Sequence, residues 1–261
     1  MNTSVFKSCN YKKDIEFCVR PAHRIDTALW SEIFGDDKDD IREFISACVS
    51  SAYAVSFVSS MKTLSQFLAV ECNISSVRGI YIYALCTSPA YRGREYMREL
   101  LAVAKDHFLR FGYKFFMLLP ADEKLAETYR RIGFSHPLAA YATPLPEREG
   151  DVFGESEEIL KLEKEDFDGD ITKLYELSSK VFSYELFRYF ISAFSSVFKV
   201  FSFRDGEGEC GFAIACGKRL LLTCKKHSIL VRNEGRISAL VMPFRQLPSS
   251  FYSAIPEIMP R

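Results

Sequence analysis

The pattern of apolar and polar positions is most informative between residues 80 and 108, where a strand pattern gives way to a helix pattern. Residues 80–87 form a run rich in Ile, Tyr, Leu and Thr, which is typical of a β-strand. Pro89 ends this strand because proline cannot donate to a sheet ladder. Gly93 gives the following turn backbone freedom, and we expect a helix to begin near Arg94. The helix carries an apolar stripe at helical spacing, formed by Leu100, Leu101, Ala104 and Phe108.

A second buried strand is predicted at Phe115–Leu119, and Pro120 ends it. The next segment, 122–132, has the pattern of a short helix, with Gly133 as its C-cap. The start of the preceding helix leaves backbone amides unpaired beside the positive end of the helix dipole. Such a helix start is a site for phosphate oxygens, and arginines at the same turn add positive charge.

The rest of the chain also mixes strands and helices, which predicts an α/β protein with a mixed α+β sheet. Before residue 80 we expect a strand at 15–20, a helix at 26–34 with Asp26 as its N-cap, a helix at 41–50, and a hairpin of 53–58 and 66–71. Towards the C-terminus we expect strands at 159–162, 197–203, 210–216, 220–224 and 237–243, and helices at 171–182 and 185–194. The segment 143–158, between these two groups of elements, is acidic and contains two prolines and two glycines, so we interpret it as a linker. We therefore expect a first domain at 1–142 and a smaller α+β domain at 159–261.

Composition narrows the classes of function. The 34 Lys and Arg residues balance the 34 Asp and Glu residues, so net charge does not favour binding to nucleic acid or to a membrane surface. No apolar run has the length of a signal peptide core or a membrane span, so we expect a cytoplasmic protein. The eight cysteines and four histidines lack the spacing of metal ligands. We expect buried thiols and no metal site.

Two motifs in this chain resemble those of the GCN5-related N-acetyltransferases, the GNAT superfamily. Pro89-Ala90-Tyr91-Arg92-Gly93 matches the family's Pro-x-Tyr-Arg-Gly turn before the cofactor helix. Residues 129–134, YRRIGF, match its Tyr-x-x-x-Gly-Phe helix after the next strand. The resemblance covers roughly residues 15–138. It implies a GNAT acetyltransferase fold with two splayed parallel strands, and a tandem arrangement in which the second domain is a degenerate GNAT repeat is one interpretation. That second domain carries neither motif.

The resemblance also implies a substrate and a set of site residues. Acetyl-CoA would be the cosubstrate, held between the strands 80–87 and 115–119. Backbone groups of Leu85, Cys86 and Thr87 would pair with its pantetheine amides. The turn and helix start, comprising Arg92, Gly93, Arg94, Glu95, Tyr96 and Met97, would hold the pyrophosphate. Tyr129 matches the family tyrosine that protonates the leaving thiolate, and the other interpretation of Tyr129 is a core tyrosine.

The chain departs from the family pattern at three positions. Glu95 stands where the family has its central glycine, and Met97 stands where it has a small residue. A carboxylate at position 95 would repel a pyrophosphate unless it turns outward or pairs with a neighbouring arginine. The family's strand glutamate is also missing, which leaves Glu71 as a candidate base, with a water chain as the other candidate. In the related enhanced-intracellular-survival acetyltransferases, the C-terminal carboxylate serves as base. By this resemblance the carboxylate of Arg261 is a further candidate, whereas the alternative is a tail that packs on its own domain.

These observations support three hypotheses. The first is an acetyl-CoA-dependent N-acetyltransferase that acetylates a primary amine of a small molecule or peptide by direct attack. The second is a non-catalytic protein that binds or senses acyl-CoA, which Glu95 favours. The third is an aminoacyl-transferring relative with tandem domains, against which the balanced charge argues. The sequence identifies neither the acceptor amine nor an oligomeric state.

Overall fold

The computed structural model describes residues 5–140, 143–144, 172, 175, 180–193, 198–204, 210–216, 219–225 and 236–247. The chain divides into two compact units. The first consists of Met1–Pro137 together with Leu240–Ala254, and the second consists of Leu138–Ala239 together with Ile255–Arg261. Among the described residues, no helix is long and apolar enough to cross a membrane.

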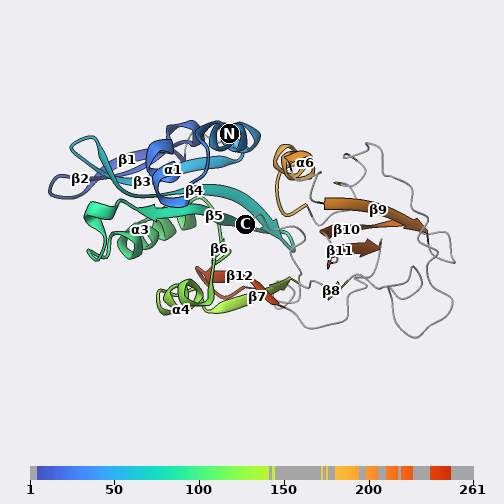
Figure 1. Ribbon diagram of the computed structural model, residues 1–261. Helices are drawn as coiled ribbons and strands as arrows, with labels where there is room; N and C mark the ends of the chain where they lie inside the picture. The colour runs from blue at the N-terminus through green and yellow to red at the C-terminus, as the bar shows by residue number, and fades with distance from the viewer. Residues whose placement is uncertain are drawn as a thin grey trace. The chain divides into compact units, whose positions relative to one another are not determined.

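A mixed eight-stranded sheet forms the centre of the first unit (Figure 1). Its strand order is β1-β2-β3-β4-β5-β6-β12-β7. The pair β5–β6 is parallel, whereas the pairings from β1 to β5 and the pairing of β6 with β12 are antiparallel. This mixed sheet confirms the expected fold class. The strands are β1 (Lys7–Lys12), β2 (Ile15–Pro21), β3 (Ala52–Ser59), β4 (Lys62–Ile74), β5 (Val77–Thr87), β6 (Phe115–Leu118), β7 (His136–Ala140) and β12 (Arg236–Pro243).

Four α-helices connect these strands: α1 (Thr27–Phe34), α2 (Lys38–Cys48), α3 (Tyr96–Arg110) and α4 (Glu123–Arg131). Three of them begin at an aspartate whose carboxylate accepts a backbone N–H of the first turn. Asp26 accepts from Leu29 in α1, Asp37 accepts from Asp39 in α2, and Asp122 accepts from Leu125 in α4. Two short 3₁₀ turns, Ala22–Arg24 and Pro89–Tyr91, precede α1 and α3.

The two faces of the sheet have different apolar coverings. On one face, α3 packs its stripe against alternate strand residues such as Tyr53, Val55 and Phe57 in a continuous core. On the other face, the rings of Trp30 in α1 and Phe44 in α2 lie 5.5 Å and 4.7 Å from the ring of Tyr83 in β5. Because side chains alternate along a strand, neighbouring residues of β5 serve both coverings.

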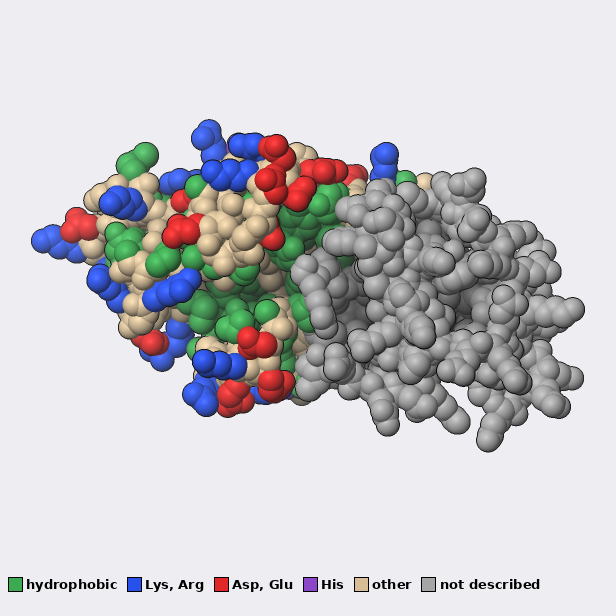
Figure 2. All heavy atoms as spheres, viewed as in Figure 1, with side chains coloured by type: hydrophobic (Ala, Val, Ile, Leu, Met, Phe, Trp, Pro, Cys, Tyr) green, Lys and Arg blue, Asp and Glu red, His purple; other side chains and the backbone are tan. Residues whose placement is uncertain are grey.

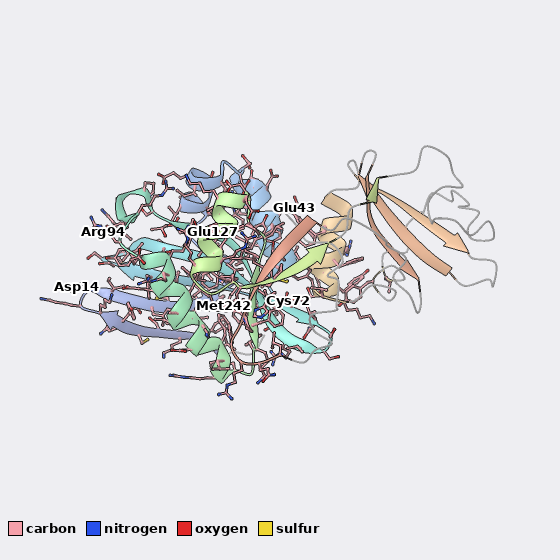
Figure 3. All side chains as sticks on the ribbon, turned by 90° about the horizontal axis from the view of Figure 1, so that it is seen from below. Asp14, Glu43, Cys72, Arg94, Glu127 and Met242 are labelled. Carbon is pink, nitrogen blue, oxygen red and sulfur yellow. The ribbon has the colours of Figure 1, made fainter. Side chains whose placement is uncertain are left out.

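Strand β12 comes from near the end of the chain and lies between β6 and β7. Leu240 pairs with Leu118 of β6 in antiparallel register, and the amide of Phe244 donates to the carbonyl of Lys114 at 2.8 Å. Met242 lies in the interior of the first unit, as Figure 3 shows, and its side chain would contact a Cβ placed at Gly133. The first unit therefore includes residues beyond the expected boundary at 142, and the start of the tail packs on this unit.

The described part of the second unit contains a four-stranded sheet with the order β8-β11-β10-β9. Its antiparallel strands are β8 (Thr143–Pro144), β9 (Phe198–Arg204), β10 (Cys210–Cys216) and β11 (Arg219–Lys225). Helix α6 (Tyr184–Ala193) matches the expected helix at 185–194. Thr143–Pro144, expected in the linker, forms β8. The rest of 143–158, the strand 159–162 and most of the helix 171–182 lie outside the described residues.

Several element boundaries differ from the sequence prediction. Helix α3 begins at Tyr96 rather than near Arg94, because Glu95 still has left-handed backbone geometry with φ at +63°. The C-cap of α4 is Ile132, and Gly133 follows it with φ at +111°. Strand β1 was not predicted. Its sequence, KSCNYK, carries no apolar alternation, and its exposure pattern is mostly solvent-facing.

The place of β12 in the core leads to a stability prediction. Leu240 is fully buried (0% exposed), so replacing it with Ala should lower the free energy of unfolding by about 2–5 kcal/mol. Leu125 in α4 is 39% exposed, and we expect Leu125→Ala to cost less than about 1 kcal/mol. Chemical denaturation of both variants checks the difference. Equal losses would contradict the position of β12 within the sheet.

Candidate functional site

The parallel strands β5 and β6 pair only at their beginnings. The parallel register comprises Ile80 with Phe116 and Tyr81 with Met117. Strand β6 then ends at Leu118, whereas β5 continues to Thr87. Within the described chain, no strand pairs with the second half of β5 on the side of β6, so no sheet ladder continues along that edge. Figure 2 shows hydrophobic side chains gathered on this face of the first unit.

A β-bulge bends β5 where it leaves β6. On the side of β4, Leu68 pairs with Tyr83 and Gln66 pairs with Cys86, so Phe67 faces the two residues between them. One of these, Ala84, has φ at +50°, in the left-handed region that residues with a Cβ rarely adopt. A bulge of this kind re-aims the backbone of the strand and leaves groups unpaired. The bulge includes Leu85, the first of the predicted pantetheine-binding residues, and directly precedes the other two, Cys86 and Thr87.

Strand β4 holds the end of β5 after the bulge. The hydroxyl of Ser65 donates to the carbonyl of Cys86 at 3.0 Å and lies 3.0 Å from the hydroxyl of Thr87. The Cys86 side chain is almost fully buried, and burial raises the pKa of its thiol to about 12. Hydrogen bonds from β4 and burial therefore hold the backbone that follows the bulge in position.

The turn after β5 places the start of α3 beside the end of this strand. Gly93 has φ at +73°, and a Cβ built on it would meet nothing within 4 Å. The first intrahelical hydrogen bond of α3 runs from Glu99 N–H to the Glu95 carbonyl at 3.0 Å. The amides of Tyr96, Met97 and Arg98 precede it and point out of the helix end. Open space, positive dipole and unpaired amides together suit an anion.

The charged side chains at this turn differ in their contacts. Arg92 donates from Nε to the Thr87 carbonyl at 3.4 Å, and the Arg94 guanidinium lies 5.6 Å from the ring centroid of Tyr91. Figure 3 shows Arg94 at the edge of the unit. The Glu95 carboxylate lies 3.1 Å from Nε of Arg98. Glu95 thus pairs one turn along the helix rather than with Arg92 or Arg94.

Helix α4 positions Tyr129. The residue is 8% exposed, and its ring packs edge-on against Phe134 at 5.8 Å. Among the described residues, none hydrogen-bonds the Tyr129 hydroxyl. Burial raises the pKa of Tyr129 to about 12, and electrostatic interactions with Asp122 and with Cys86 add to the rise. A buried hydroxyl without a partner is costly, so it is a candidate for contact with a bound molecule.

Glu71 belongs to a different part of the sheet. It pairs with Ile80 at the closed beginning of β5, away from Leu85, Cys86 and Thr87. Its Oε1 accepts the hydroxyls of Tyr53 and Tyr113, both at 2.6 Å, and its Oε2 lies 3.8 Å from Arg78. These contacts are those of a carboxylate that ties strands together. Arg261, the other candidate base, lies outside the described residues.

Two contributors to this site, Ala84 and Gln66, are not evident from motifs in the sequence. Ala84 gave no signal, because alanine is not a residue that favours positive φ. Gln66 gave a signal that was not used, namely an amide within an apolar strand run, and it is 1% exposed. Among the described residues, no group of three or more His, Cys, Asp or Glu side chains could hold a metal ion.

Comparison with known proteins finds one family model and several solved structures of similar fold. The sequence model described as the Acetyltransferase (GNAT) family matches residues 37–134, which include β5, the turn, α3, β6 and α4. No curated protein matches the sequence. A probable N-acyltransferase from Enterococcus faecalis is similar in structure, with a TM-score of 0.53 and 15% identity. That match covers 75% of this chain and 54% of the other, so the chain spans about half the length of that structure.

Two further solved structures are similar at lower scores. A putative acetyltransferase from Pyrococcus horikoshii has a TM-score of 0.49 and 8% identity, over 95% of this chain and 96% of its own. An aminoglycoside acetyltransferase from an uncultured soil metagenomic sample has a TM-score of 0.38 and 11% identity, over 47% of this chain and 90% of its own. The segment that the family model matches contains the parting strands β5 and β6, and the E. faecalis structure has a similar fold. Residues 37–134 match the model of the Acetyltransferase (GNAT) family, and the chain shares its fold with the E. faecalis structure.

Proposed function

We propose that this protein is an acetyl-CoA-dependent N-acetyltransferase that acetylates a primary amine of a small molecule or peptide by direct attack. The observation that carries the proposal is the bulged end of β5 at Ala84, which lies beyond the last residue that pairs with β6 and leads into the open turn at Gly93. A chain built only to turn a corner does not require a strained bulge beside an unpaired helix start.

Each part of this arrangement fits one part of acetyl-CoA. The edge of β5 that β6 has left suits the amides of the pantetheine arm, and the amides at the start of α3 suit the pyrophosphate. Acetyl-CoA supplies a thioester carbonyl as the electrophile. The chain would hold this carbonyl against the bulge and exclude water from it, so that the amine attacks in a fixed geometry.

Tyr129 is the proposed proton donor to the departing sulfur. A phenol with a pKa of about 12 is a poor match for a thiol in water, whose pKa is about 8.5. Cys86, however, reports how this site treats a thiol, and burial raises its pKa to about 12 as well. Burial would raise the pKa of a departing thiol in the same direction, which reduces its mismatch with the Tyr129 phenol.

The proposal also concerns the general base that deprotonates the amine and the cellular location of the protein. Glu71 is a less favourable base than its sequence position suggested, because its Oε1 already accepts two tyrosine hydroxyls at the closed end of the strands. The described cysteines Cys9, Cys18, Cys48, Cys72 and Cys86 are free thiols, which fits a reducing compartment such as the cytoplasm. A degenerate repeat in the second domain also stays a prediction.

A second function is favoured by one observation, the presence of Glu95 where the family has a glycine. A carboxylate at a pyrophosphate site would weaken binding, as expected of a non-catalytic protein that senses acyl-CoA. Two measurements separate the proposals: thermal stabilisation by acetyl-CoA, and release of free thiol with a panel of amines. Stabilisation without thiol release from any amine would favour the sensor, and stabilisation with release would favour the enzyme.

Gly93→Asp tests the pyrophosphate position. The new carboxylate occupies the open space at the helix start, so the variant should lose the stabilisation by acetyl-CoA, which is about 2.7 kcal/mol at 100 times the dissociation constant. Gly112→Asp is the matched control, because Gly112 follows the other end of α3 with φ at +86° and equally open space. Differential scanning fluorimetry with and without acetyl-CoA checks both. An unchanged shift in Gly93→Asp would refute the assignment.

Glu95→Gly tests whether the departure from the family pattern affects the fold or the ligand. Glycine relieves the strain of φ at +63°, so the variant should be more stable by about 1 kcal/mol. Because Glu95 already pairs with Arg98, acetyl-CoA affinity should change less than about threefold. Glu95→Ala keeps the strain and loses the carboxylate, so it should not gain stability. Calorimetric titration measures the affinities, and a tenfold gain in Glu95→Gly would show that the carboxylate opposes the ligand.

Tyr129→Phe tests the proton donor. We expect kcat to fall on the order of 100-fold or more, while stabilisation by acetyl-CoA stays the same. Tyr113→Phe gives the opposite pattern, because it removes a hydrogen bond to Glu71 and should lower the melting temperature with little effect on kcat. Steady-state kinetics by thiol release measures both. Full activity in Tyr129→Phe would return this residue to a purely structural role.

A further inference from the structure

The start of α1 lies against the strand pair that carries the bulge. Gln66 of β4 pairs with Cys86 of β5 and directs its amide to the backbone of Asp26. Its Oε1 accepts from the Asp26 N–H at 2.9 Å, and its Nε2 donates to the Asp26 carbonyl at 2.8 Å. Both polar atoms of a 1% exposed amide are therefore used to hold one residue. This contact fixes where α1 begins.

The first turns of α1 then pass along the bulge. Gln66 links Asp26 to Cys86, because it hydrogen-bonds the first and pairs with the second. One turn later, the ring of Trp30 lies 5.5 Å from the ring of Tyr83. Tyr83 and Cys86 are the residues on either side of the bulge. The N-terminal part of α1 therefore spans the segment whose backbone leaves the ladder.

The Asp26 carboxylate accepts a hydrogen bond and, among the described residues, forms no ion pair. One oxygen accepts the Leu29 N–H at 3.0 Å as the helix cap. The residue is partly exposed, and within the described chain its carboxylate forms no ion pair. The other oxygen can therefore accept a further hydrogen bond, because a carboxylate has several acceptor positions.

Side chains from different parts of the chain interact with the Cys86 thiol. The pKa of Cys86 is raised first by burial, and the Asp26 carboxylate raises it further, while Gln66 and Arg92 lower it. Cys86 in turn contributes to the raised pKa of Tyr129 in α4, after burial and Asp122. Asp26 and Tyr129 are thus both close enough to Cys86 to interact with it electrostatically.

We propose that the Asp26 carboxylate accepts the proton of the acceptor amine, directly or through one water. This inference rests on the proposed function. The amine nitrogen forms a bond to the thioester carbonyl carbon, the carbon–sulfur bond breaks, and the sulfur takes the proton of Tyr129. The proton lost by the amine passes to Asp26, and exchange with water restores both groups. The negative charge of Asp26 also favours an acceptor that arrives as an ammonium ion, which must first give one proton to water to become the neutral amine that attacks.

Asp26→Asn isolates the charge from the structure. Asparagine caps a helix as well as aspartate does, so α1 should keep its start and its contact with Gln66. We expect kcat/KM for acetyl transfer to fall on the order of 100-fold, while the melting temperature and the stabilisation by acetyl-CoA stay close to wild type. Asp37→Asn is the matched control, because it makes the same exchange at the cap of α2 and should keep activity within about twofold.

A second variant separates proton transfer from positioning. Asp26→Gly also keeps a tolerated cap and removes the side chain, so added formate should recover part of the lost turnover. Recovery in Asp26→Gly, with none in Asp26→Asn where the amide fills the site, supports the proposal. Near wild-type activity in Asp26→Asn overturns it and leaves the proposed function intact, as does a lost activity that formate does not recover in Asp26→Gly. A wild-type protein that releases no thiol with any amine refutes the proposed function, and this inference with it.

Discussion

The bulge at Ala84 is the constraint on which the candidate site depends. A residue with a Cβ at positive φ costs on the order of 1 kcal/mol, and it persists only where the surroundings hold it. Here both flanks are held. Tyr83 is packed under Trp30 and Phe44, and the Cys86 carbonyl accepts the Ser65 hydroxyl. Because Tyr83 and Cys86 are both held, the two residues between them keep the bulged conformation, and the backbone at the parting of β5 and β6 is preorganised.

The opposite end of the same strand pair is held shut by a polar cluster. The Glu71 carboxylate on β4 accepts hydrogen bonds from Tyr53 of β3 and from Tyr113, which follows α3 in the chain. The guanidinium of Arg78 in β5 lies 4.5 Å from the centroid of the Tyr113 ring. Removing any one partner would leave a partly buried charge undercompensated, so the cluster is held together as a unit. The parallel strands are therefore closed at one end by this cluster and parted at the other by the bulge. Glu71 contributes to the site through this closure rather than through direct contact with Leu85.

The sequence predicted the elements better than it predicted their irregularities. The run 80–87, the turn at Gly93 and the strand 115–119 were correct because composition and breakers agree there. The hairpin turns Ser60-Met61 and Ser75-Ser76 adopt positive φ without glycine or asparagine, so their tight geometry had no residue signal. The bulge and the Gln66–Asp26 contact depend on register between strands, which local patterns do not encode. The position of β12 depends on a pairing between distant parts of the chain. The acidic stretch at 143–158 predicted instead that the first domain ends before it.

That distant pairing has a consequence for how the protein is made. Synthesis proceeds from the N-terminus at roughly 5–20 residues per second, so β6 leaves the ribosome on the order of ten seconds before its partner β12. During this interval β6, whose four residues are all buried in the finished sheet, has an unpaired and apolar edge. A nascent chain stalled between these strands would present that edge to other chains. Rare codons or pauses in the intervening segment would therefore affect the yield of folded protein more than pauses after residue 247.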